Sequence, residues 1–188
     1  DMVVLVGDIM DYESRFAEME HIEDDLQQLK APLGVYVVNG NHEYRANRFA
    51  KYRWLAKTGT TLLIDSVVQP DSSFYLIGRD DYVNKKRKAL HTLMADIDTT
   101  KPIIVLDHQP WSFAEMAMNG VDLGLHGHTH NGQLWPYPLL MKLIYECPYG
   151  YHKKGPTQFY VSSGIGIAGP PYRVGTVSEL VVLHIKFK

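Results

Sequence analysis

Four short polar stretches, each directly after an apolar run, constrain the fold of this 188-residue chain most strongly. The apolar runs have the length and composition of buried strands, and they span 2–6, 35–38, 103–106 and 121–125. The polar stretches that follow read Gly-Asp-Ile-Met-Asp (7–11), Gly-Asn-His-Glu (40–43), Asp-His-Gln-Pro (107–110) and Gly-His-Thr-His (127–130). Strand exits of an α/β sheet gather residues from distant parts of the sequence. The pattern therefore predicts one polar site at the edge of an α/β sheet.

The side chains in these stretches are of kinds that bind metal ions. Asp8 offers a carboxylate, Asn41 a carboxamide oxygen, and imidazoles come from His108, His128 and His130. Mixed oxygen and imidazole donors suit Mn²⁺, Fe²⁺ or Zn²⁺ and do not select among them. Each residue also has an ordinary interpretation: Asp favours helix N-caps, and Asn-Gly is a common hairpin turn. Four such stretches in order, each at a strand end, favour the metal site.

The series resembles the calcineurin-like metallophosphoesterases, whose motifs run D-x-H, G-D-x-x-D, G-N-H-[ED], a lone His and G-H-x-H. Motifs two to five occur here in that order, between Gly7 and His130. The downstream residues are similar to one bacterial branch, which contains membrane-associated phosphoesterases and a UDP-2,3-diacylglucosamine pyrophosphatase. These residues are Gln133, Ser163-Gly164-Ile165-Gly166, Pro171-Tyr172-Arg173 and Glu179.

The first family motif, Asp-x-His, does not occur in this chain. Only six residues precede Gly7, whereas a parallel crossover needs about a dozen or more. We therefore expect residues 1–188 to form one N-terminally truncated phosphoesterase domain. The resemblance implies an α/β fold with two mixed β-sheets packed face to face and flanked by helices, here without the first βα unit.

The resemblance also implies a role for each polar residue. In the full-length protein, Asp8 would bridge two divalent ions. Asn41, His108 and His128 would complete one ion, and His130 would serve the other together with the missing Asp-x-His. A hydroxide between the ions would attack a phosphodiester, pyrophosphate or phosphomonoester. His42 is then the candidate general acid for the leaving oxygen, because an imidazole titrates near neutral pH. The alternative is a non-catalytic scaffold with a decayed metal site, which would not need these residues.

Three residues outside the predicted ligand set keep two interpretations each. Asp11 either forms a turn or cap, or acts as a ligand or as a partner that orients His42. Arg173 either contacts a substrate phosphate or forms an ion pair with Glu179. His126 fits a buried strand position better than a ligand position.

The segment 135–151 is rich in aromatic and aliphatic residues and is punctuated by three prolines. Its ordinary interpretation is a short helix packed on a sheet. The functional interpretation is an apolar surface beside the metal site that meets a membrane or a lipid-phosphate substrate. A small phosphorylated substrate and a bacterial cytoplasmic or membrane-associated location are the corresponding expectations.

Composition sets broader limits on the class of protein. The hydrophobic content of 45% and charged content of 21% are ordinary for a globular domain. The net charge of −2 gives no reason to expect nucleic acid as a partner. A single cysteine, Cys147, rules out a disulfide within the chain.

Periodicity predicts helices over 13–30, 44–57 and 85–97. Strands are predicted over 61–65 and 74–78 as a hairpin joined by a Pro-Asp-Ser-Ser turn, and over 158–162 and 179–187. We expect residues 2–106 to supply the first sheet and the β-rich tail to supply the second.

Overall fold

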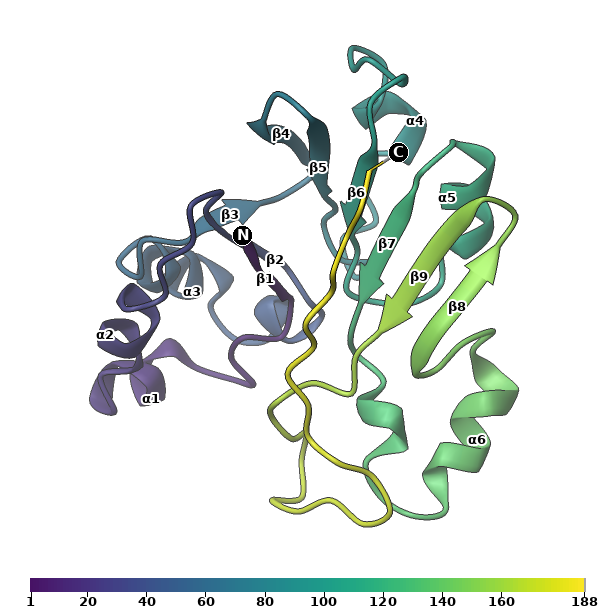
Figure 1. The fold of residues 1–188 in the computed structure, drawn as a ribbon. Coiled ribbons are helices and arrows are strands. Elements are labelled where there is room, and N and C mark those ends of the chain that lie inside the picture. The colour runs from purple at the N-terminus through teal and green to yellow at the C-terminus, as the bar shows by residue number, and fades with distance from the viewer. Residues whose placement is uncertain (188) are drawn as a thin grey trace.

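The computed structural model describes residues 1–187, which form two sheets flanked by short helices (Figure 1). The first sheet has three parallel strands in the order β1-β2-β3, with bounds Val3–Val6, Val35–Val38 and Thr61–Leu63. The second has six strands in the order β4-β5-β6-β7-β9-β8. Their bounds are Ser66–Asp71, Phe74–Gly78, Ile103–Leu106, Leu123–His126, Thr157–Val161 and Gly150–Lys154. The predicted α/β fold with two sheets is confirmed.

The division of strands between the sheets differs from the prediction. The first sheet ends at Leu63, and the second begins with β4 rather than with the tail. The predicted hairpin of 61–65 with 74–78 is wrong, because β3 pairs with β2 and the antiparallel partner of β5 is β4. The turn at 72–73 directly joins β4 to β5, and Asp71 accepts bonds from the Ser73 amide and hydroxyl there. The predicted strand over 179–187 is also absent from the described residues.

A shared apolar core joins the two sheets. Val38 and Leu63 of the first sheet pack with Leu76, Ile104 and Leu106 of the second. The neighbouring β6 residues, Ile103 and Val105, belong to a separate cluster on the outer face of the second sheet. This alternation follows from the two-residue period of a strand. It sends the two residues after β6, 107 and 108, to opposite faces of the sheet.

The helices are shorter than periodicity predicts. The range 13–30 holds two helices, because His21 adopts a left-handed φ of 53° between them. Helix bounds are α1 Ser14–Met19, α2 Ile22–Gln27, η1 His42–Tyr44, α3 Arg48–Leu55, α4 Leu90–Leu93, α5 Phe113–Met118, η2 His130–Gly132 and α6 Tyr137–Ile144. Buried Trp54 and Leu55 of α3 pack on Val37 and Met10, which fixes this helix behind the first sheet. Among residues 1–187, no helix combines the length and apolar character that a membrane span requires.

Candidate metal centre

Four predicted ligands meet where strands of both sheets end. Asp8 follows β1, Asn41 follows β2, His108 follows β6 and His128 follows β7. The Oδ2 atom of Asp8 lies 2.9 Å from Nε2 of His108, and Nδ1 of His128 lies 2.8 Å from Oδ1 of Asn41. The donor atoms of Asp8, His108 and His128 all lie within 4.8 Å of one another. Residues up to 120 positions apart in sequence thus form one cluster.

Two motif glycines allow the loops that carry these residues to touch. Gly7 has a φ of +82°, and a Cβ there would lie 2.6 Å from the His108 ring. A Cβ on Gly40 would lie 2.1 Å from Oδ1 of Asp8. Neither distance is tolerable, so a side chain at either position would push the ligands apart. Steric contact therefore explains why positions 7 and 40 of these motifs are glycine.

Burial and mutual charge set the protonation of the cluster. Burial alone would raise the pKa of Asp8, but the His108 ring and the His42 amide lower it to about 2. Burial opposes a charge on His108, yet the Asp8 carboxylate and the Val6 carbonyl raise its pKa to about 9. Burial lowers the pKa of His128 to about 4, so this ring is neutral at pH 7. The metal-free cluster is a carboxylate paired with one imidazolium, and an incoming cation would displace that proton.

The geometry fits a divalent cation. Nδ1 of His108 lies 2.6 Å from the Val6 carbonyl, and only an N–H at that position can make this hydrogen bond. The opposite nitrogen, Nε2, is buried and has no hydrogen-bond partner of acceptable geometry, although Asp8 is near. Such a backbone bond to the far nitrogen is how metal-binding histidines are oriented. With the metal bound, the neutral ring would present its Nε2 lone pair beside the Asp8 carboxylate.

His42 sits beside the cluster and has its own acidic partner. Its Nδ1 lies 2.6 Å from Oδ1 of Asp11, and its Nε2 lies 3.8 Å from Oδ2 of Asp8. Arg45 donates to the same oxygen of Asp11 at 3.1 Å. Of the two interpretations of Asp11, the structure matches the partner that orients His42. The imidazole therefore directs Nε2 toward the predicted metal ligands.

His130 lies apart from the other four predicted ligands. It begins η2 with a left-handed φ of 50°, and it does not belong to the group of donors within 4.8 Å. Burial and the nearby Arg173 charge lower its pKa. His128 also has positive φ, so the segment 127–130 is a turn and not an extended strand. Asp8 and His128 belong to the convergent group, whereas His130 borders it.

Arg173 does not form the ion pair with Glu179 that was one of its two interpretations, and contact with a substrate phosphate stays a prediction. Its guanidinium donates to four backbone carbonyls, those of His130, Ser163, Gly164 and Gly166. Within residues 1–187 it forms no ion pair with Glu179, which instead accepts a bond from the Ser163 amide. Arg173 thus ties the tail to the turn that carries His130.

His126 occupies a buried structural position, as its pattern indicated. Its ring packs against Phe113 and Phe159 on the outer face of the second sheet. Its Nδ1 lies 2.6 Å from the Asp107 carbonyl oxygen. Burial lowers its pKa to about 4, so the ring is neutral at pH 7. His126 is therefore a core residue on the outer face of the second sheet and not a metal ligand.

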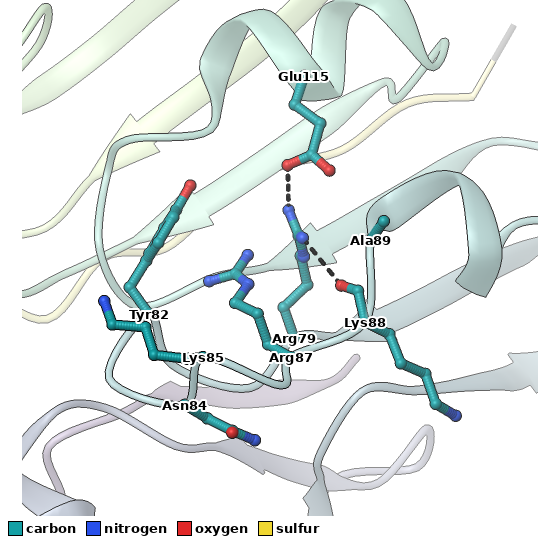
Figure 2. A pocket seen from close by; sticks show the side chains of 8 residues that line it. All are labelled: Arg79, Tyr82, Asn84, Lys85, Arg87, Lys88, Ala89 and Glu115. Carbon is teal, nitrogen blue, oxygen red and sulfur yellow. Dashed lines mark hydrogen bonds and ion pairs between the residues drawn. The ribbon is translucent and has the colours of Figure 1, made fainter.

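A cavity of about 330 Å³ lies on that outer face and is lined by charged residues (Figure 2). Figure 2 shows the Arg79 guanidinium bonded to the Glu115 carboxylate and to the Lys88 carbonyl. Arg87 makes two hydrogen bonds to Asp107, at 3.2 and 2.7 Å. The residues that line this cavity include no member of the metal cluster, so the cavity and the cluster are separate sites.

Sequence reasoning missed two buried charged residues behind the cluster, Glu43 and Lys51. In the sequence, Glu43 stands out only as the last residue of the Gly-Asn-His-Glu motif. Nothing marked Lys51, because a lysine on a helix is ordinarily a solvated residue.

Comparison with known proteins places these motifs in a family. The model of the calcineurin-like phosphoesterase family matches residues 1–132. An uncharacterized metallophosphoesterase of Aquifex aeolicus is 33% identical over all of this chain and 74% of its own length. One of Helicobacter pylori is 35% identical over 98% of this chain and 51% of its own. A zebrafish (Danio rerio) transmembrane protein with metallophosphoesterase domain is 31% identical over 99% of this chain and 46% of its own.

The chain spans about half the length of several relatives that it matches. No solved structure matches it significantly. The names of the relatives specify no substrate, and they do not single out the UDP-2,3-diacylglucosamine pyrophosphatase branch.

Proposed function

Since this chain belongs to the calcineurin-like phosphoesterase family, we propose that it hydrolyses a phosphodiester, pyrophosphate or phosphomonoester with two divalent ions. In this proposal Asp8, Asn41, His108 and His128 would hold one ion, and Asp8 and His130 would contribute to holding the other. The observation that carries the proposal is the convergence of Asp8, His108 and His128 within 4.8 Å. A scaffold with a decayed site would have no reason to keep it.

When bound, the ions would supply an activated water and would neutralise the phosphoryl oxygens. The protein must supply the proton for the leaving oxygen. His42 is the group for this step, because Asp11 holds Nδ1 and leaves Nε2 directed toward the cluster. Asp11 would also stabilise the protonated ring before the transfer. Arg45 in turn restrains Asp11.

The proposal is tested by metal analysis and turnover of the purified protein. Mn²⁺, Fe²⁺ and Zn²⁺ would each be added to metal-free protein, with an aryl phosphodiester, an aryl phosphomonoester and a nucleoside-diphosphate sugar as substrates. We expect metal-dependent hydrolysis of at least one. Metal binding without any turnover would favour the scaffold, and no binding at all would contradict the site. Asp8→Asn is the matched inactive control.

We also infer that the segment 135–151 contacts a membrane surface or the acyl part of a lipid-phosphate substrate. Helix α6 has no buried residue, and Leu143 is 84% exposed. Trp135, Tyr137, Leu139 and Leu140 are exposed as well. Between 134 and 145 there is no carboxylate, and Lys142 is the one charged residue. Exposed apolar and aromatic groups beside a cation are typical of helices that lie on anionic lipid.

Vesicle co-sedimentation tests this second proposal. The protein should bind vesicles of phosphatidylglycerol and phosphatidylcholine, and Leu143→Glu should weaken that binding about tenfold. Met118→Glu is the matched control, because Met118 is 80% exposed at the end of α5. If both variants bind as the wild type does, α6 is not the contact surface.

A further inference from the structure

We propose that Glu43 and Lys51 are positioning residues that hold the two loops of the metal centre together. The proposal rests on the proposed function, because it concerns the same site. Both side chains are 0% exposed, although Glu and Lys are almost never fully buried without a partner. Neither forms an ion pair with another side chain among residues 1–187. Their partners are backbone groups of the loops 7–11 and 40–43.

The Glu43 carboxylate binds four backbone amides from two loops. Oε2 accepts from the Asp8 and Gly40 amides at 2.8 and 2.7 Å. Oε1 accepts from the Ile9 and Met10 amides at 2.9 and 3.3 Å. Successive amides that point at one anion form an anion-binding concavity of the backbone, and here a side chain of the protein fills it. Glu43 therefore sets the path of the chain on both sides of Asp8.

Lys51 binds the carbonyl groups of the same loops. From helix α3, its ammonium donates to the His42 carbonyl at 2.5 Å and to the Met10 carbonyl at 3.4 Å. Glu43 thus accepts hydrogen bonds from backbone amides of the two loops, and Lys51 donates hydrogen bonds to their backbone carbonyls. Because α3 is packed behind the first sheet, Lys51 also ties both loops to that helix.

The conformation of Asp8 explains why such a restraint is needed. Asp8 has a left-handed φ of 54°, which a non-glycine residue keeps only where its surroundings determine it. Loss of the bond from the Asp8 amide to Glu43 would remove a restraint against relaxation to a negative φ, leaving the bond that the Asp8 carboxylate accepts from the His42 amide. The carboxylate would then leave His108, which lies only 2.9 Å away. The restraint should therefore contribute to metal affinity although neither Glu43 nor Lys51 is a ligand.

The first experiment measures Mn²⁺ affinity by calorimetry for Glu43→Gln, Glu43→Asp and Lys51→Met. We expect each to bind about 10–100-fold more weakly, as changes to groups that orient metal ligands do. Glu43→Asp keeps the charge but is one methylene shorter, so it separates positioning from charge. The matched controls are Glu146→Gln and Lys154→Met, which remove a surface ion pair of 2.8 Å and should bind within about twofold of the wild type. Wild-type affinity in Glu43→Asp or Lys51→Met would overturn the proposal.

The second experiment uses the metal-free wild-type protein and does not depend on the variants folding. Amide hydrogen exchange should show the Asp8, Ile9, Met10 and Gly40 amides protected, well beyond amides in exposed loops. Rapid exchange at these amides would overturn the proposal. If the wild type binds no metal while the amides are protected, the proposed function fails and the positioning role in the loops stands.

Discussion

The two parts of the proposed metal site are built in different ways. Asp8, Asn41, His108 and His128 each follow a strand, and they lie in contact as two pairs, Asp8 with His108 and Asn41 with His128. His130 instead sits in a turn with left-handed backbone and is tied to the tail by Arg173. We call the first group the strand-exit ligands. In the second group, His130 is the turn ligand and Arg173 is its tether.

The two groups are held in place by different interactions. Strand exits are held by the sheets and by a core that the two sheets share, so their positions follow from the fold. The turn ligand depends on four hydrogen bonds from Arg173 to carbonyls as far as 43 residues away. Damage to the strand-exit part should therefore abolish metal chemistry, whereas damage to the tether should only weaken it.

The largest effect is expected for Asp8→Asn. This change keeps the shape of the side chain and removes the charge that would bridge the ions. Losing the metals removes several kcal/mol of transition-state stabilisation, and about 1.4 kcal/mol corresponds to a factor of ten. Hydrolytic activity on the substrate that the wild type turns over should fall about 10⁴-fold, together with metal content. A variant that retains both ions and near-normal activity would contradict the bridging role.

His42→Ala should separate proton transfer from metal binding. Removing a general acid typically lowers the rate about 10²–10⁴-fold. We expect kcat to fall within that range while metal content, measured by plasma emission, stays close to that of the wild type. If the metal is lost as well, His42 belongs among the strand-exit ligands. A substrate with a better leaving group should recover part of the rate, because it needs less protonation.

Acid should lower the free energy of unfolding through His126, which is buried two residues before His128. Its pKa is lowered by burial from 6.5 to about 4 in the folded protein, so the unfolded chain binds more protons between these values. The free energy of unfolding is therefore unaffected by this group above pH 6.5. It falls as the pH drops toward 4, by roughly 3 kcal/mol for this shift. Urea unfolding of His126→Phe should show a shallower loss over that range. An unchanged pH profile would remove His126 as the cause.

The smallest effect is expected for the tether. Arg173→Ala leaves the strand-exit ligands in place but frees the turn that carries His130. The affinity for one ion should fall by about tenfold, the lower end of effects on groups that orient ligands, while the other ion binds as before. Calorimetric titration with Mn²⁺ resolves the two steps. Equal weakening of both ions would show that the two parts of the site are not separately supported.

The sequence by itself determined the α/β class, the strand exits and the residues that meet there. Strand periodicity is a local property, and the motif spacing that follows each strand is legible without coordinates. Asp8, Asn41, His108 and His128 could be named because they follow these strands and match the motifs of the family that the sequence resembles. The orientation of His42 by Asp11 was one of two alternatives, because a turn and an ion pair use the same residue type.

Only the tertiary structure decided what depends on contacts distant in sequence. Helix 13–30 breaks at His21, and the second sheet begins at β4, since the packing of each segment overrides its local preference. Residues 107 and 108 turn to opposite faces of one strand, so Asp107 bonds to Arg87 beside the charged cavity whereas His108 joins the metal cluster. Glu43 and Lys51 bind backbone groups up to 41 residues away, and backbone groups leave no signal in the sequence.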